Sequence, residues 1–175
     1  MGKARRPVQI IILVFIVILG GYAISSAVFG GGPGKPEPGD KPPAVKLLGL
    51  DGKVHTLEEY KGKAVVLNFW ATWCTYCVNE MPALQAQWEK WRDQGVVVLG
   101  INTGEDEMTV RNFTEQLGID FPILHDFEND AVRNYGVVPM PTTFFVNKKG
   151  RIASIREGEL DLETLDDQIK QLVNP

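Results

Sequence analysis

The sequence predicts an α/β domain in which helices flank a mixed central sheet. Three observations support this fold class. Two continuous apolar segments rich in β-branched residues, 64–70 and 96–101, have the composition of strands buried on both faces. A segment with helical spacing of its apolar residues, 75–92, lies between them, so the three form a strand–helix–strand unit with a right-handed crossover. Two further strands and a helix follow, which makes the expected sheet mixed rather than wholly parallel.

The size and charge of the chain limit what it can be. Its 175 residues correspond to one domain with accessory segments, and 44% hydrophobic with 23% charged residues is an ordinary globular balance. The net charge is −4, but residues 44–175 alone carry 13 basic and 20 acidic side chains. A domain with a net negative charge and no cluster of basic residues is not expected to bind nucleic acid.

The amino-terminal segment 8–29 predicts a transmembrane helix. It has no charged residue, and its polar side chains are Gln9, Tyr22, Ser25 and Ser26. Its 22 residues compare with about 20 needed to span a bilayer. The tail 1–7 carries three basic residues, which favour a cytoplasmic amino terminus. We therefore expect a single-pass protein of the cell membrane with its folded domain on the extracytoplasmic side.

A cleaved secretory signal is the alternative interpretation of this segment. Small residues at Ala23, Ser25 and Ala27 are suitable for a signal peptidase, and the product would then begin near Val28. A lipoprotein signal is excluded because no cysteine lies near the segment. Both interpretations export the domain.

A linker is predicted at 30–43. It contains five Gly and five Pro and no aliphatic or aromatic side chain that could form a core. Such a composition predicts a flexible, partly extended tether that holds the domain away from the bilayer. The folded domain is accordingly expected at 44–175.

The domain is expected to begin with a hairpin. Strands over 45–50 and 54–56 flank Asp51-Gly52, a strong short hairpin signal. Thr56 and Glu59 have the spacing of a capping box, which predicts a short helix directly after the hairpin.

The middle of the domain predicts an inserted strand–helix unit. A helix is expected at 109–117, a short strand at 121–124, and a second helix that Asn129 caps and that ends near Tyr135. The acidic run 105–107 is expected to be a solvated start of the first of these helices.

The chain is expected to end with a second hairpin and a helix. Residues 142–147 and 151–157 predict antiparallel strands around a Lys-Lys-Gly turn. Asp161 is placed to cap a final helix whose apolar residues share one face.

The only two cysteines, Cys74 and Cys77, lie where the first buried strand ends and the long helix begins. Free amides and the dipole of a helix amino terminus stabilise an anion, so Cys74 is expected to be the attacking thiol. Cys77 lies about one helical turn further on, close enough to form a disulfide and to act as the resolving thiol.

Metal binding and an inert disulfide are the competing interpretations of this pair. Zinc needs about four ligands, and the chain adds only His55 and His125, on separate predicted elements. Copper(I) could bind two thiolates, but no adjacent His or Met cluster supports it. A structural disulfide across so short a loop would stabilise little. The placement therefore favours redox catalysis, with no cofactor and no metal expected.

Two segments resemble the thioredoxin fold: NFWATWCTYCVNEMP at 68–82 and the Pro-Thr pair within VPMPTTFFVN at 138–147. With the apolar anchor, the leading hairpin and the insertion, nearly the whole chain resembles membrane-anchored extracytoplasmic thiol–disulfide oxidoreductases of the ResA/TlpA type. That group includes reductants of cytochrome c maturation. The motifs are specific for the fold but separate substrates poorly.

The resemblance implies that Cys74 attacks a substrate disulfide and that Cys77 resolves the mixed disulfide. It also implies a cis peptide bond at Met140–Pro141 facing the cysteines, with Pro139 as the competing candidate. The residues expected to contact substrate are Trp73, Met140, Pro141 and Thr142.

Glu80 matches an acidic residue that ResA-type proteins place beside the active site. It lies three residues after Cys77, so its carboxylate can share that helix face, raise thiol pKa values and move protons. The broader thioredoxins carry a buried Asp where this chain has Asn68, and because an amide cannot accept the proton, that role is either absent or transferred to Glu80. We expect Glu80 to tune the site without holding the fold; the alternative is a solvated helix residue.

The expected function is that of an extracytoplasmic reductant. Outside the cytoplasm oxidation is the default, so a reductant there needs electrons from across the membrane. The resemblance implies a transmembrane dithiol carrier as donor and the haem-binding cysteine pair of apocytochrome c as substrate. Alternatives are reduction of another cell-envelope protein, oxidation of secreted proteins, a copper carrier or redox-responsive tether, and a thiol peroxidase.

Overall fold

The computed structural model describes residues 15, 19–20 and 35–173. Most of the predicted membrane segment 8–29, together with the tail 1–7 and residues 30–34 of the linker, lies outside the described residues. Within the part of the chain that is described, no helix has the length and hydropathy needed to cross a membrane. The anchor therefore stays a prediction.

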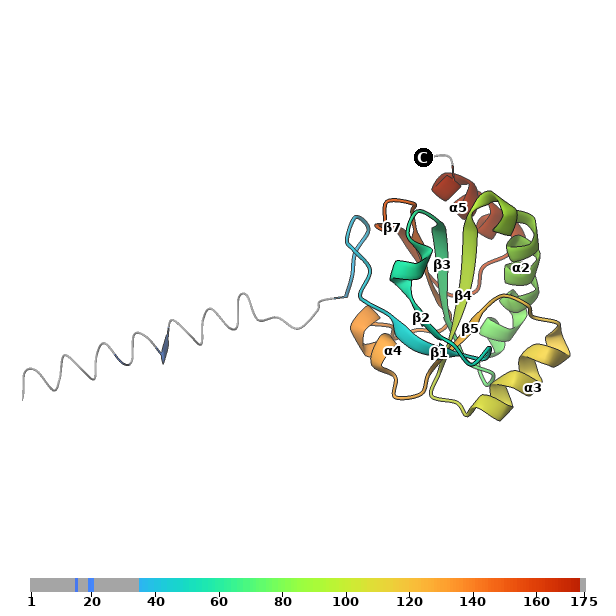
Figure 1. The fold of residues 1–175 in the computed structure, drawn as a ribbon, viewed down its shortest axis with the longest axis horizontal. Helices are drawn as coiled ribbons and strands as arrows, with labels where there is room; N and C mark the ends of the chain where they lie inside the picture. Colours follow the sequence, from blue (N-terminus) through green and yellow to red (C-terminus); the bar gives the residue numbers. More distant parts are fainter. Residues whose placement is uncertain (1–14, 16–18, 21–34, 174–175) are drawn as a thin grey trace, which may run out of the picture. The chain divides into compact units, whose positions relative to one another are not determined.

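The folded unit alternates strands and helices along the chain (Figure 1). In order, the elements are β1 (Lys46–Gly49), β2 (Val54–Thr56), η1 (Leu57–Tyr60), β3 (Ala64–Trp70), α2 (Thr75–Trp91), η2 (Arg92–Gln94), β4 (Val96–Thr103), α3 (Glu107–Leu117), β5 (Ile123–Asp126), α4 (Asp130–Tyr135), β6 (Thr142–Val146), β7 (Ile152–Glu157) and α5 (Leu162–Val173).

All seven strands form one mixed sheet in the order β2-β1-β5-β4-β3-β6-β7. The three central strands β3, β4 and β5 run parallel, while β6 pairs antiparallel with β3 and β1 pairs antiparallel with β5. The leading hairpin and the strand–helix insertion are both present. The predicted α/β class and the mixed sheet are thus confirmed.

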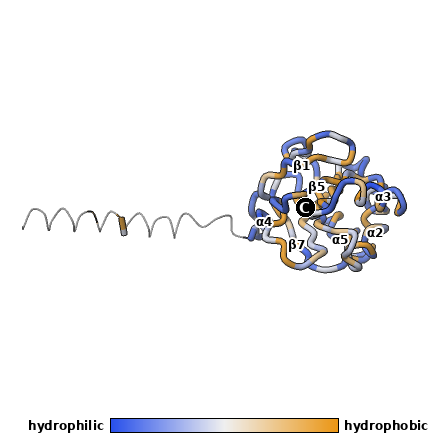
Figure 2. The backbone as a smooth tube through the Cα atoms, turned by 90° about the horizontal axis from the view of Figure 1, so that it is seen from below, coloured by the Kyte–Doolittle hydropathy of each residue, from blue (hydrophilic) through white to orange (hydrophobic). Residues whose placement is uncertain are grey.

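The sheet is covered on both faces, which explains why every residue of β3 except Asn68 is apolar. Its alternate residues Val66 and Trp70 belong to a core under α2, α3 and α5, whereas Leu67 and Phe69 belong to a core under α4 and η1. A strand buried on both faces has no polar side to present to water. Figure 1 shows helices on both sides of the sheet, and in Figure 2 hydrophobic and hydrophilic stretches alternate along the tube of the folded unit.

Two predictions in the insertion are corrected. The strand expected at 121–124 is β5, which begins at Ile123 and ends at Asp126. Asn129 precedes α4 but has a left-handed backbone (φ 57°), and its side chain makes no capping bond. Asp126 caps the helix instead, because its buried carboxylate accepts hydrogen bonds from the backbone N–H groups of Ala131 (3.0 Å) and Val132 (2.9 Å).

The predicted linker 30–43 is corrected for residues 35–43, which pack on the domain instead of acting as a tether. Gly39 N–H donates to the carbonyl of Ile152 at 2.8 Å, and Ile152 N–H donates to Asp40 O at 2.9 Å. Tyr135 donates its hydroxyl to the carbonyl of Pro43 at 2.8 Å. Backbone hydrogen bonds and the buried rings of Pro36 and Pro42 hold this segment against the domain.

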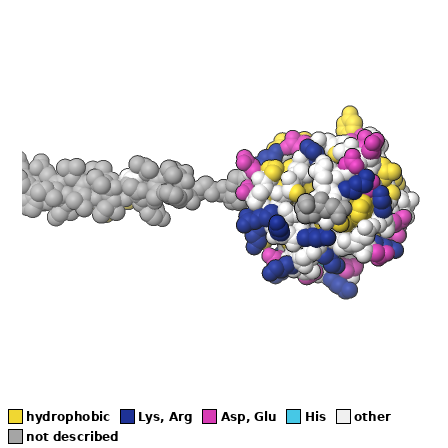
Figure 3. Space-filling view, turned by 90° about the horizontal axis from the view of Figure 1, so that it is seen from above, with side chains coloured by type: hydrophobic (Ala, Val, Ile, Leu, Met, Phe, Trp, Pro, Cys, Tyr) yellow, Lys and Arg dark blue, Asp and Glu magenta, His cyan; other side chains and the backbone are white. Residues whose placement is uncertain are grey.

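The surface carries charges of both signs. In Figure 3 acidic and basic side chains are interspersed on the face shown, without one sign dominating it. This pattern is typical of a solvated surface.

Candidate active site

The two cysteines form a disulfide at the junction of β3 and α2. Their Cα atoms are 5.2 Å apart. Cys74 occupies the capping position of α2, and its sulfur accepts a hydrogen bond from the backbone N–H of Cys77 at 3.3 Å. Cys74 is 7% exposed and Cys77 is fully buried. The Cys77 amide in the first turn of α2 therefore points at the sulfur of the more accessible cysteine, where it would stabilise a thiolate.

An exposed aromatic residue directly precedes each cysteine: Trp73 precedes Cys74, and Tyr76 precedes Cys77. Trp73 is 68% exposed and Tyr76 is 64% exposed, whereas Trp70, at the end of β3, is fully buried in the core. Trp70 is thus a core residue, as expected, and Trp73 presents a large apolar surface beside Cys74. Exposed aromatic side chains with unused contact area are common in binding surfaces.

A second loop lies against the cysteine segment. The Met140–Pro141 bond is cis, as the resemblance implied, and it directly precedes β6. Thr142 pairs with Phe69 in the antiparallel β3–β6 ladder, so the start of β6 meets the end of β3. The Thr103 hydroxyl lies 3.5 Å from the carbonyl of Trp70 and 3.6 Å from the sulfur of Met140, and so contacts both loops.

Pro141 and Thr142 are less exposed to solvent than expected for residues that contact substrate. Both are buried, and the Thr142 hydroxyl donates to the Pro139 carbonyl at 2.7 Å. Met140 is partly exposed. The Thr142 side chain is therefore used inside the loop, and the exposed surface around the disulfide comes from Trp73, Tyr76 and Met140.

Glu80 is not a solvated residue. It is 1% exposed, and each carboxylate oxygen accepts a hydrogen bond: Oε1 from Asn68 Nδ2 at 2.6 Å and Oε2 from the backbone N–H of Leu160 at 2.9 Å. It thereby joins α2 to β3 and to the segment before α5. The alternative of a solvated helix residue is therefore wrong, whereas the effect of Glu80 on the stability of the fold stays a prediction.

Burial raises the pKa of Glu80 to about 7. Loss of hydration is the main cause, and the nearby Glu159 carboxylate adds to it, while the hydrogen bonds from Leu160 and Asn68 act in the opposite direction. A carboxyl group with such a pKa exchanges protons near neutral pH.

Asn68 has a second role in this network. Its amide nitrogen also donates to the Thr143 hydroxyl at 2.9 Å, while its oxygen is buried without a hydrogen-bond partner among the described residues. The amide thus stabilises the ionised form of Glu80. The sequence linked Asn68 and Glu80 only through the proton-accepting role. In the structure the two side chains are in direct contact.

Glu105 was not anticipated as a residue of this region. It was expected in a solvated helix start, but its carboxylate accepts hydrogen bonds from the backbone N–H and the hydroxyl of Thr72, two residues before Cys74. Asp106 and Glu107 are solvated at the start of α3, as expected. No local pattern distinguishes Glu105 from these two neighbours, because its partners lie on other segments.

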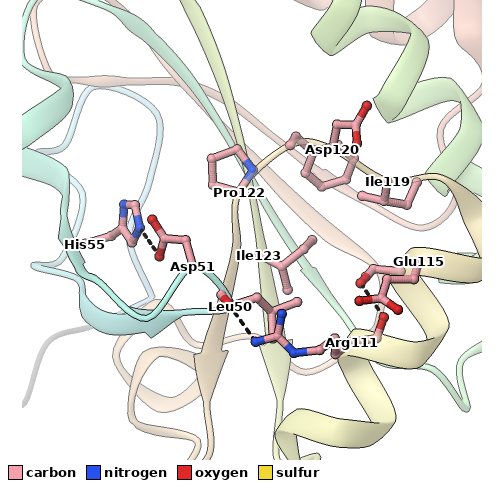
Figure 4. Close-up of a pocket in the computed structure, with 11 residues that line it drawn as sticks. Leu50, Asp51, His55, Arg111, Glu115, Ile119, Asp120, Pro122 and Ile123 are labelled. Carbon is pink, nitrogen blue, oxygen red and sulfur yellow. Dashed lines mark hydrogen bonds and ion pairs between the residues drawn. The ribbon is translucent and has the colours of Figure 1, made fainter.

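The histidines lie away from the cysteines. His55 lines a pocket of about 350 Å³ between the leading hairpin and α3, shown in Figure 4. Its imidazole is paired with Asp51, and Arg111 donates to the carbonyl of Leu50. Neither cysteine lines this pocket. Among the described residues, no group of three or more His, Cys, Asp or Glu side chains is arranged to hold a metal ion.

Known proteins match both the sequence and the fold. Residues 38–155 match the model of the AhpC/TSA family. The chain is 35% identical to the thiol-disulfide oxidoreductase ResA of Bacillus subtilis (strain 168), over 100% of this chain and 97% of that protein. It is 33% identical to ResA of Bacillus cereus, over 98% of this chain and 99% of that protein.

Solved structures agree with these matches. A thiol:disulfide interchange protein DsbE from Chlorobium tepidum has a TM-score of 0.75 and 28% identity, covering 79% of this chain and 99% of that one. StoA from Bacillus subtilis, at 24% identity and a TM-score of 0.65, shares the fold and covers 73% of this chain and 97% of that one.

Fold and site together define a thioredoxin-like thiol–disulfide oxidoreductase, an enzyme that exchanges a dithiol for a disulfide. The chain belongs to the AhpC/TSA family, and it is similar over nearly its whole length to ResA proteins.

Proposed function

We propose that this chain is a membrane-anchored reductant that acts outside the cytoplasm on the disulfide of the haem-binding cysteine pair in apocytochrome c. The observation that carries the proposal is the Cys74–Cys77 pair on the same helix as a buried carboxyl group, Glu80, with a pKa of about 7. Such a group can transfer the protons that accompany dithiol oxidation.

The exchange would proceed in two steps. The Cys74 thiolate attacks one sulfur of the substrate disulfide; the substrate S–S bond breaks, a mixed disulfide forms, and one substrate thiolate leaves. Cys77 then loses its proton to Glu80 and attacks the Cys74 sulfur. The mixed disulfide breaks, the second substrate thiolate leaves, and two electrons have passed to the substrate. The enzyme is left with the Cys74–Cys77 disulfide.

The location follows from the sequence of the amino terminus. The uncharged segment 8–29 and the three basic residues before it favour a retained span with a cytoplasmic amino terminus. A reductant outside the cytoplasm must be reduced again from inside, so a transmembrane dithiol carrier would be its electron donor. Residues 44–175 and the packed segment 35–43 would then face the extracytoplasmic side.

Trapping of the mixed disulfide tests the substrate. With Cys77→Ala, the resolving thiol is missing, so the Cys74 mixed disulfide should accumulate with an oxidised apocytochrome c peptide containing Cys-X-X-Cys-His. Cys74→Ala is the control and should trap far less. Mass spectrometry of non-reduced gels identifies the adduct. Adducts with another cell-envelope protein, but none with this peptide, would contradict the apocytochrome assignment.

The direction of electron flow has its own test. A reduction potential of the chain near that of thioredoxin, about −270 mV, would agree with a reductant, whereas one near about −120 mV would identify an oxidant of secreted proteins.

Cell fractionation with protease shaving tests the location. Retention in the membrane, with the domain cleaved only from the outside, is the expected result. A soluble product that begins near Val28 would contradict a retained anchor.

A further inference from the structure

We infer that Glu105 is a positioning residue for thiol–disulfide exchange, because its carboxylate fixes the Thr72–Trp73 segment on which a protein disulfide docks beside Cys74. The inference rests on the oxidoreductase activity alone. It does not depend on which protein is the substrate or on the membrane location.

The Glu105 carboxylate accepts three hydrogen bonds, two from Thr72 and one from Asn102. Its Oε2 accepts from the backbone N–H of Thr72 and from Asn102 Nδ2, each at 2.7 Å, and its Oε1 accepts from the Thr72 hydroxyl. Asn102 is fully buried near the end of β4. One side chain therefore ties the segment before the cysteines to a central strand of the sheet.

Within the segment 71–74, Ala71 and Cys74 are buried in the core, whereas Thr72 and Trp73 are not. Residues 71–74 belong to no helix or strand, and their own backbone bond runs from Cys74 N–H to Ala71 O at 3.2 Å. Trp73 is 68% exposed, so burial does not fix its position. The position of Trp73 therefore depends on the backbone on both sides of it: on Cys74, which caps α2, and on Thr72, which Glu105 holds.

The same end of β4 also contacts the opposite loop. Thr103 lies within 3.6 Å of both the Trp70 carbonyl and the Met140 sulfur. Residues 102–105 thus join the two segments that flank the disulfide. A change here should alter docking of a large substrate more than the chemistry at the sulfurs, because the cysteines themselves are held by α2.

Three variants separate geometry from charge. Glu105→Ala removes all three bonds. Glu105→Gln can keep them, because its amide oxygen can accept from both N–H groups and its amide nitrogen can donate to the Thr72 hydroxyl. Glu107→Ala is the matched control, since Glu107 is an exposed acidic residue two positions away whose partner is Arg111.

The experiment measures insulin reduction by the 175-residue chain with dithiothreitol as electron donor, together with hydrogen exchange of the Thr72 amide. For Glu105→Ala, we expect KM for insulin to rise about tenfold, kcat to change much less, and the Thr72 amide to lose protection. Glu105→Gln should stay within about twofold of the unmodified chain in both measurements.

Three results would overturn the inference. They are an unchanged KM in Glu105→Ala, retained Thr72 protection in that variant, or an equal rise in KM for Glu107→Ala. If Glu105→Ala does not fold, Thr72→Val still removes the hydroxyl bond and must raise KM about twofold or more. Because insulin is a generic protein disulfide, these results are independent of the apocytochrome proposal.

Discussion

At the scale of single residues, Glu80 and Asn68 form a buried pair whose chemistry depends on pH. The Glu80 carboxylate is shielded from water by its burial, and it accepts two hydrogen bonds, from Asn68 and from Leu160. With a pKa of about 7, it is ionised in part of the molecules near neutral pH. Its charge then opposes thiolate formation at the cysteines, while its neutral form does not.

Glu80→Gln should change how stability depends on pH. The pKa of Glu80 is about 7 in the folded chain and 4.5 as an unperturbed group. The folded state therefore binds more protons between these values, and the free energy of unfolding falls as pH rises from 4.5 to 7, by about 3 kcal/mol in total. Denaturant unfolding at pH 5 and pH 8 should show this fall in the unmodified oxidised chain and not in Glu80→Gln.

The control is Glu89→Gln, an exposed carboxyl on the same helix. It should keep the pH dependence of the unmodified chain. Equal slopes for all three proteins would show that Glu80 is not the group responsible.

Asn68→Asp should couple two carboxyl groups. The change places a second carboxyl where the amide nitrogen now lies 2.6 Å from Glu80 Oε1. Two carboxylates at this distance cannot both ionise freely, so the pair should share one proton and titrate in two steps, the second above pH 7. Carbon-13 NMR of the carboxyl groups measures this. The exposed Asn134→Asp is the control and should titrate independently; a single ordinary step for residue 68 would contradict the expectation.

At the scale of elements, an ionic cluster joins α2 to α5. Asp166 accepts hydrogen bonds from Lys90 Nζ at 2.7 Å and Trp91 Nε1 at 2.9 Å, and it pairs with Lys170 at 2.9 Å. The Lys90 bond is the main reason why the pKa of Asp166 is lowered, with Lys170 and Trp91 adding to it. The cluster fixes the end of the helix that carries both cysteines.

Asp166→Asn should loosen this helix contact. The free energy of unfolding should drop by about 1 kcal/mol at pH 7, since charged hydrogen bonds are lost at a partly exposed site. Because the pKa is lowered on folding, the contribution of Asp166 is present above pH 3.8 and is lost as pH falls below that value, so the difference should vanish in acid. Asp167→Asn, exposed and adjacent, is the control and should have little effect on thermal unfolding.

The elements differ in how far the sequence determines them. β3 and the start of β4 were predicted correctly because a strand covered on both faces is apolar along most of its length, with Asn68 as the polar exception in β3. β5 and the cap of α4 were misplaced because the buried Asp126 carboxylate, rather than a local pattern, decides where that helix begins. The cysteine pair could be found from its spacing. The environments of Glu80 and Glu105 could not be predicted in this way. Glu80 is bonded to Leu160, 80 residues away in sequence, and Glu105 is bonded to Thr72, 33 residues away.

At the scale of the whole molecule, residues 35–43 extend the domain beyond the leading hairpin. They reach from β7 to α4, through Gly39 and Asp40 at one end and Pro43 at the other. A segment whose apolar side chains are all prolines is thus held by hydrogen bonds to two elements distant in sequence.

Tyr135→Phe tests how firmly this segment is held. The change removes the hydroxyl that donates to the Pro43 carbonyl and leaves a fully buried ring in place. We expect a loss of about 1 kcal/mol in the free energy of unfolding and faster proteolysis within 35–43. Tyr76→Phe, exposed, should alter neither. Unchanged proteolysis of Tyr135→Phe would show that other contacts suffice.

The hydrogen bonds of Gly39 and Asp40 also bear on self-association. An open sheet has two edge strands, whose unpaired N–H and C=O groups can pair with a strand of another molecule. One edge strand here is β2, which has only three residues. The other is β7, where the N–H and C=O groups of Ile152 are already bonded to Asp40 and Gly39. Cleavage within 35–43 would free the backbone groups of Ile152 and lengthen the unpaired edge of β7 that a foreign strand could join. The nicked domain, rather than the intact one, is therefore the form expected to aggregate.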